Sequence, residues 1–157
     1  MPRRDPAGRP AISSASALRG SPERRASSID IYNNDIHLTN DDFVEGDGGV
    51  HNIRIFQNRG VNAAHNGYSA QPVFGGPIYF HRNLLYHVPG GGAFKLSAVP
   101  AGILAYHNTL ISEQTAGSPY SNAHFRNNLF IGRDAPNRGV MTWAFATGDY
   151  SSDYNGF

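Results

Sequence analysis

The chain contains no cysteine and only one lysine, Lys95, among its 157 residues. The lack of cysteine excludes disulfide bonds and thiolate metal sites and leaves the redox compartment open. No stretch approaches the about 18 consecutive apolar residues that a membrane-spanning helix needs, so we expect no membrane span. No apolar segment typical of a secretory signal peptide is visible near the N-terminus.

Residues 1–27 differ in composition from the rest of the chain. They hold six arginines among Pro, Ala, Ser and Gly, with Asp5 and Glu23 as the only acids. Such a segment cannot bury enough apolar surface to order itself, so we expect a disordered basic tail. With a net charge of +1 for the whole chain, the tail carries +4 and residues 28–157 carry −3. A basic tail can bind nucleic acid, but we favour a linker or a misassigned start and expect no nucleic-acid partner.

An asparagine follows a short β-like run five times, at Asn34, Asn58, Asn83, Asn108 and Asn128. The steps between them are 24, 25, 25 and 20 residues, which indicates a repeat protein with one coil per repeat. Apolar residues lie five and three positions before each asparagine, the spacing of a strand with one buried face. These pairs are Ile29 and Ile31, Ile53 and Ile55, Ile78 and Phe80, Ile103 and Ala105, and Ala123 and Phe125.

The period is too short for a strand–helix–strand unit, and asparagines scattered in the turns of a β-sandwich would not keep both apolar pairs at fixed offsets. Residues 28–157 resemble the right-handed parallel β-helix repeat proteins of the pectate-lyase-like superfamily, in which asparagines stack as a hydrogen-bonded ladder inside one turn. The resemblance implies an all-β solenoid of about five to six coils, with Asn155 as a sixth rung. Because the sequence stops at Phe157 in the middle of a repeat, we expect a fragment of a longer β-helix.

Four carboxylates gather within seven residues of the first repeat. They are Asp41, Asp42, Glu45 and Asp47. If Val44 points into the core, strand alternation turns Asp41, Phe43, Glu45 and Asp47 outward, with Glu45 and Asp47 about 6.6 Å apart. That arrangement suits two cooperating carboxylates, or a calcium site formed by all four acids if the segment bends at its glycines. Alternatively, the aspartates make turn hydrogen bonds and the other acids are solvated.

Lys95 belongs to the same column as Glu45. Glu45 lies thirteen residues before Asn58, and Lys95 lies thirteen before Asn108. The two positions should therefore be two coils, or about 9.6 Å, apart. Lys95 would neutralise a uronate carboxylate, or act as a base if its pKa were lowered. The alternative is a surface salt bridge with Glu45 worth at most about 1 kcal/mol. We take Glu45, Asp47 and Lys95 as candidate catalytic residues.

A further column lies two positions before each asparagine. It contains Tyr32, Phe56, His81 and Tyr106, followed by Arg126. Stacked rings on successive coils predict a flat strip on which sugar rings would lie, and the four ring residues are our candidate substrate-binding residues. Packing between the rings at a corner of the coil is the alternative.

The resemblance implies an extracytoplasmic or secreted protein that binds or acts on an acidic polysaccharide, as a lyase or a glycoside hydrolase. Asp41 and Asp42 resemble the paired aspartates of polygalacturonase-like hydrolases, but the chain lacks the Gly-His-Gly and Arg-Ile-Lys motifs of that family. The second hypothesis is a non-catalytic surface or glycan-binding module. Nothing in the sequence indicates the oligomeric state.

Overall fold

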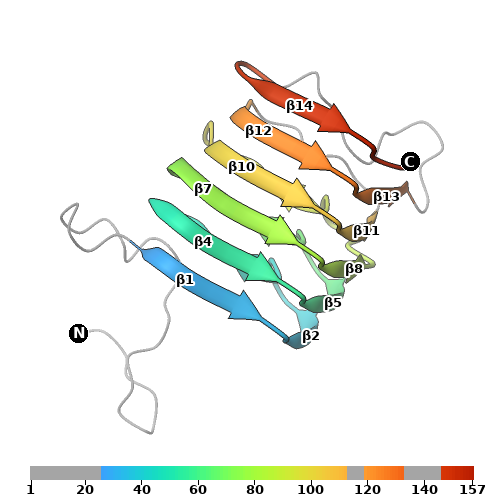
Figure 1. Cartoon of the computed structure of the whole chain (residues 1–157). Helices are drawn as coiled ribbons and strands as arrows, with labels where there is room; N and C mark the ends of the chain where they lie inside the picture. The colour runs from blue at the N-terminus through green and yellow to red at the C-terminus, as the bar shows by residue number, and fades with distance from the viewer. Residues whose placement is uncertain (1–25, 113–118, 133–145) are drawn as a thin grey trace, which may run out of the picture.

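The computed structural model describes residues 26–112, 119–132 and 146–157 (Figure 1). In these parts all the secondary-structure elements are β-strands, and each strand pairs in parallel with strands of neighbouring turns. No helix among the described residues has the length and apolar character needed to cross a membrane. The all-β parallel β-helix predicted from the asparagine repeat is therefore confirmed.

Three parallel sheets form the sides of the solenoid. The large sheet contains β1 (Ser27–Tyr32), β4 (His51–Phe56), β7 (Phe74–His81), β10 (Ala101–Tyr106), β12 (Ser121–Arg126) and β14 (Tyr150–Asp153), in that spatial order. The middle sheet contains β2 (Asp35–Thr39), β5 (Arg59–Ala63), β8 (Leu84–Tyr86), β11 (Thr109–Ser112) and β13 (Leu129–Gly132). The short sheet contains β3 (Val44–Glu45), β6 (Tyr68–Ser69) and β9 (Phe94–Lys95). Figure 1 shows the large sheet facing the viewer, with the chain turning at its strand ends into the middle sheet.

The described strands amount to about four turns, fewer than the five to six expected. After β9 the described strands no longer occupy all three sheets: two turns have strands in the large and middle sheets, and the last has only β14. Residues 113–118 and 133–145 of these turns lie outside the described parts. At the other end, β1 begins at Ser27, one residue before the expected start of the repeats. The disordered tail was predicted for residues 1–27, of which residues 1–25 lie outside the described parts and Ser27 belongs to β1.

The predicted apolar pairs form two continuous columns inside the solenoid. Ile53 pairs in register with Ile78, and Ile55 pairs with Phe80. The eight members of these columns on β4, β7, β10 and β12 are at most 3% exposed. Ile29 is 39% exposed because β1 is the edge strand of the large sheet. The core is thus the sum of equivalent side chains stacked turn upon turn, as the period-two pattern predicts.

The asparagine ladder lies at the corner between the large and middle sheets. Asn83 illustrates its pattern: the backbone N–H and Nδ2 both donate to Oδ1 of Asn108 at 3.0 Å, and Nδ2 also donates to the backbone oxygen of Ile55 at 2.9 Å. The same bonds link each rung to the next from Asn34 to Asn155, which confirms the sixth rung. The residue before each rung has a positive φ of 52° to 59°, which turns the chain between the two sheets. These residues are Asn33, Gln57, Arg82, His107, Asn127 and Tyr154.

Candidate functional site

Residues from the first and third turns form an acidic site on and beside the short sheet. It comprises Asp41, Asp42, Glu45, Asp47 and Lys95, the set in which the sequence places catalytic and calcium-binding roles. Backbone register aligns Glu45 with Ser69, and Ser69 with Lys95. The predicted common column of Glu45 and Lys95 is therefore confirmed.

The ion-pair partner of Lys95 differs from the predicted one. Its Nζ donates to Oδ2 of Asp42 at 2.9 Å, and no ion pair between Lys95 and Glu45 occurs among the described residues. The Asp42 side chain is fully buried, whereas that of Lys95 is 27% exposed. The predicted surface salt bridge with Glu45 is thus replaced by a pair that is buried on its acidic side. Removing one partner of such a pair leaves the other charge desolvated and unpaired. For this reason alone, breaking it costs more stability than breaking an exposed pair.

Strand alternation in the sequence predicted that Phe43 points outward. In the structure Phe43 is 7% exposed and belongs to the core. The prediction was wrong because β3 begins only at Val44, so alternation does not extend back to residue 43. Phe43 lies in the corner before the strand, where its N–H donates to the backbone oxygen of Gly67 at 2.8 Å. Its ring fills the space that a side chain at Gly60 would occupy, since a Cβ there would lie 2.7 Å from the ring.

Asp42 also links two turns through its second oxygen. The backbone N–H and Nδ2 of Asn66 donate to Oδ1 of Asp42 at 3.0 and 2.9 Å, and the N–H of Gly92 donates to Oδ1 of Asn66 at 3.2 Å. Sequence reasoning missed this second short ladder. The available signal was the offset, because Asp42 and Asn66 each lie eight residues after a rung of the main ladder.

Asp47 is held by the turn that follows it. Its Oδ1 accepts hydrogen bonds from Ser69 Oγ at 2.5 Å and from the backbone N–H of Gln71 at 2.7 Å. Burial raises the pKa of Asp47 although these hydrogen bonds act in the opposite direction. Asp47 is therefore a partly buried acid with a fixed orientation.

Asp41, Asp42 and Glu45 each present one carboxylate oxygen, and these three atoms lie within 4.8 Å of one another. The segment therefore bends, as a shared ion would require, but Asp47, predicted as a fourth ligand, is not in this group. Carboxylate oxygens are the ligands that calcium prefers, and calcium needs six to eight of them. Water or a bound anion would have to supply the rest.

Glu45 is exposed at the surface of the site, and its pKa is raised. Partial burial is the largest cause, followed by the negative charges of Asp47, Asp42 and Asp41, while Lys95 acts in the opposite direction. A carboxyl group with a raised pKa holds its proton closer to neutral pH, which suits a general acid.

Lys95 remains a cation. Desolvation lowers the pKa of its ammonium group, but the hydrogen bond and charge of Asp42 and the charges of Asp47 and Asp41 outweigh it, so the pKa is raised. The lowered pKa that a lysine base needs is not met. Lys95 can supply positive charge to a bound anion, in competition with Asp42.

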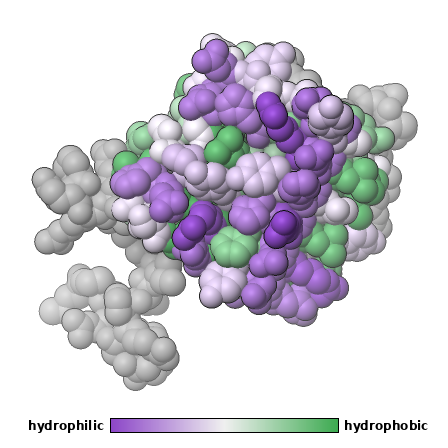
Figure 2. All heavy atoms as spheres, viewed as in Figure 1, coloured by the Kyte–Doolittle hydropathy of each residue, from purple (hydrophilic) through white to green (hydrophobic). Residues whose placement is uncertain are grey.

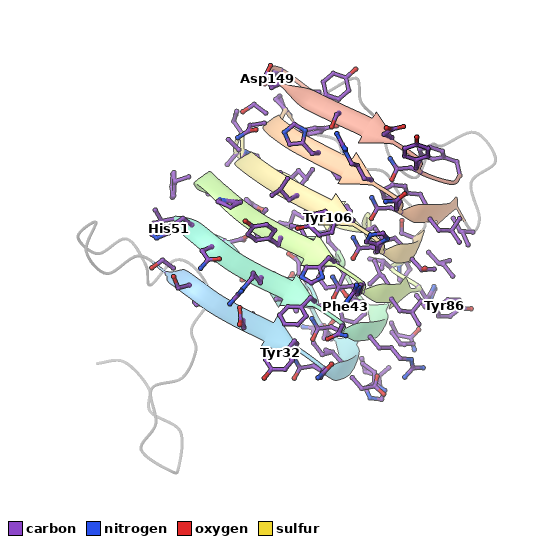
Figure 3. The ribbon with its side chains drawn as sticks, in the orientation of Figure 1. Tyr32, Phe43, His51, Tyr86, Tyr106 and Asp149 are labelled. Atoms are coloured by element: carbon purple, nitrogen blue, oxygen red, sulfur yellow. The ribbon has the colours of Figure 1, made fainter. Side chains whose placement is uncertain are left out.

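The predicted ring column is present at the ends of the large-sheet strands. Figure 3 shows Tyr32 at the end of β1 and Tyr106 at the end of β10. Successive ring centroids from Tyr32 through Phe56 and His81 to Tyr106 lie 4.9, 4.9 and 5.5 Å apart, with interplanar angles of 6°, 4° and 20°. Each inner ring is therefore covered on its faces by its neighbours, which leaves mainly ring edges exposed. The two end rings, Tyr32 and Tyr106, each have one face that no ring of the column covers, and Tyr32 is 51% exposed, so its outer face is open for stacking with a sugar ring. The packing alternative explains the two inner rings, Phe56 and His81, better.

The fold defines the class of this chain as a parallel β-solenoid with an asparagine ladder and an acidic site on its short sheet. Comparisons with protein-family models, with curated proteins and with solved structures find no match. The function must therefore be argued from the site itself.

Proposed function

We propose that this protein is a carbohydrate-active β-helix that binds or acts on an acidic polysaccharide at the acidic site, and that the resemblance noted in its sequence reflects an extracytoplasmic role. The observation that carries the proposal is that Glu45, whose pKa is raised, and the protonated Lys95 share one column of the short sheet, with the oriented Asp47 two residues beyond Glu45. Perturbed acids beside a charge partner are typical of functional sites.

Each group has a distinct role in this proposal. Glu45 donates or accepts the proton at the bond that is cleaved, because it is exposed and its pKa is raised. Lys95 pairs with the carboxylate of a uronate ring, and Asp47 orients the substrate or activates water. In an alternative form of the proposal, calcium held by Asp41, Asp42 and Glu45 would bring positive charge against the same uronate carboxylate, and Glu45 would then be a metal ligand in place of the proton-transfer group.

The second candidate function is glycan binding without catalysis. It is favoured by the contacts of Asp42, Asp47 and Lys95, which all form hydrogen bonds between turns. If those residues are structural, Asp41 and Glu45 are left as exposed acids that hold a bridging cation. A module of this kind would retain an acidic glycan and release it unchanged.

The test is a calorimetric titration of the full chain with calcium and then with oligogalacturonate or alginate oligomers, together with assays for unsaturated products and for new reducing ends. Glu45→Gln should reduce product formation by at least about 100-fold if Glu45 transfers the proton. Asp153→Asn removes an exposed acid from β14, outside the acidic site, and should leave the rate unchanged. Binding without product favours the second candidate, and neither binding nor product across the panel refutes both.

A further inference from the structure

A shallow pocket of about 410 Å³ lies at the ladder corner of the first three turns, between the large and middle sheets. We call it the corner pocket. Its lining residues are Asn33, Asn34, Asp35, Gln57, Asn58, Arg59, Arg82 and Leu84. None of them belongs to the acidic site, so this pocket has a separate chemistry. Figure 2 shows hydrophilic side chains gathered over the side of the molecule where the large-sheet strands end.

Polar side chains on successive turns converge on the corner pocket. Asn33, Gln57 and Arg82 occupy equivalent positions immediately before three consecutive rungs of the ladder, each with a φ of about 55°. Glycine and asparagine adopt this left-handed conformation with least strain, so glutamine and arginine are unfavourable choices for the backbone alone. Two amides and a guanidinium are thereby presented side by side at one turn of spacing.

Within the described parts of the chain, one of the two cationic charges of the pocket has no acidic partner. Arg59 is paired with Asp35, whose two oxygens lie 2.9 and 3.0 Å from Nη1. Arg82 is exposed, and none of the ion pairs among the described residues involves it. The neighbouring His81 reflects this cationic surrounding, because its pKa is lowered first by burial and then by Arg82, Arg54 and His107.

We propose that the corner pocket binds a single uronate unit, with Arg82 pairing with its carboxylate and the amides of Asn33 and Gln57 bonding its hydroxyl groups. A planar guanidinium matches a carboxylate in two parallel hydrogen bonds. Leu84, which is 41% exposed, offers an apolar surface to the C–H face of the sugar. The nature of the ligand rests on the proposed function, whereas the place of the pocket does not.

The charge balance favours a monoanionic sugar over a phosphate-rich ligand. The lining carries Arg59, Arg82 and Asp35, for a net charge of +1. One carboxylate neutralises that charge, while a dianion or a polyphosphate would leave excess negative charge beside Asp35. The same corner would then hold a polysaccharide chain at a second point, away from the acidic site, which adds affinity through effective concentration.

The experiment follows the NMR signals of His81 and Gln57 while the full chain is titrated with trigalacturonate. Arg82→Gln should weaken binding at these signals about tenfold, because a hydrogen-bonded charge pair is lost. Gln57 shows that glutamine is accommodated at this backbone position one turn away. Arg126→Gln is the matched control, since Arg126 is also exposed and outside the pocket, and it should change binding by less than about twofold.

Equal weakening by both variants would show general electrostatic attraction and overturn the proposal. Equal binding of the methyl-esterified trimer, which lacks the carboxylate charge, would also overturn it, as would equally strong shifts with inorganic sulfate. The two proposals fail separately. If Glu45→Gln abolishes turnover or calcium-dependent binding while the His81 and Gln57 signals never move, the acidic site stands and the corner pocket falls. If the signals move without any calcium-dependent binding or product, the reverse holds.

Discussion

Replacing Asn108 by alanine should remove one of the fully bonded inner rungs of the ladder. Its Nδ2 donates to the backbone oxygen of Phe80 at 2.9 Å and to Oδ1 of Asn128 at 2.8 Å. Its Oδ1 accepts from the backbone N–H and from Nδ2 of Asn83. The side chain is 2% exposed, so water cannot replace these partners without opening the core.

The expected cost follows from the groups left without partners. In Asn108→Ala the N–H of Asn83 loses its acceptor and the carbonyl of Phe80 loses a donor, both in buried surroundings. Each unpaired buried group costs about 1–3 kcal/mol, so the free energy of unfolding should fall by about 2–6 kcal/mol. Since domains are stable by about 5–15 kcal/mol, the loss would be a large share of the total.

The assay is urea unfolding of the full chain followed by far-ultraviolet circular dichroism. Asn34→Ala is the matched control, because Asn34 is the exposed first rung and its Nδ2 donates only to Tyr32 and Asn58. It should cost about 1 kcal/mol, the net value of an ordinary hydrogen bond. Equal losses for the two variants would refute the argument that burial makes the inner rungs the more important ones.

Three other predictions concern the acidic site and the stacking of turns. Asp42→Asn should lower the free energy of unfolding by about 2 kcal/mol in urea titration, less than the about 3–5 kcal/mol of a fully buried pair because Lys95 is 27% exposed; no change would mean that the pair adds nothing. Because the pKa of Glu45 is raised in the folded state, the folded protein binds this proton more tightly than the unfolded chain. Stability should therefore increase as pH falls from neutral through that raised pKa, and Glu45→Gln should flatten this part of the profile; an unchanged profile would contradict the assignment. In Gly67→Ala the new Cβ would lie 2.4 Å from the backbone oxygen of Ala93 in the next turn, so the Tm in a thermal melt should fall by several degrees, and a retained Tm would show that the turns separate easily.

The fold was predictable from the sequence because independent columns repeat at fixed offsets. The asparagine rungs, the buried Ile55 and Phe80 and the stacked Phe56 and His81 all follow from one period. Repetition supplies many tests of the same register, so a single irregular position does little harm. The number of turns was less predictable, because a rung marks a corner of the coil and does not show that all three sides follow.

The acidic site was only partly predictable. The offset from the rungs correctly aligned Glu45 with Lys95, but it could not show that the lysine side chain reaches Asp42 instead, 53 residues away in the sequence. Column positions follow from backbone spacing, whereas ion pairs depend on side-chain direction at corners. The same limit explains Phe43, since alternation applies within a strand and β3 has only two residues.

The spacing between rungs has a consequence for how this molecule can change. Consecutive rungs are 24, 25, 25, 20 and 27 residues apart, yet every rung from Asn34 to Asn128 is followed at once by a strand of the middle sheet. Differences in length must therefore fall elsewhere in each coil. Insertions and deletions there leave the ladder intact. The ladder corner therefore stays constant, while the rest of each coil is free to vary, by evolution or by loop grafting.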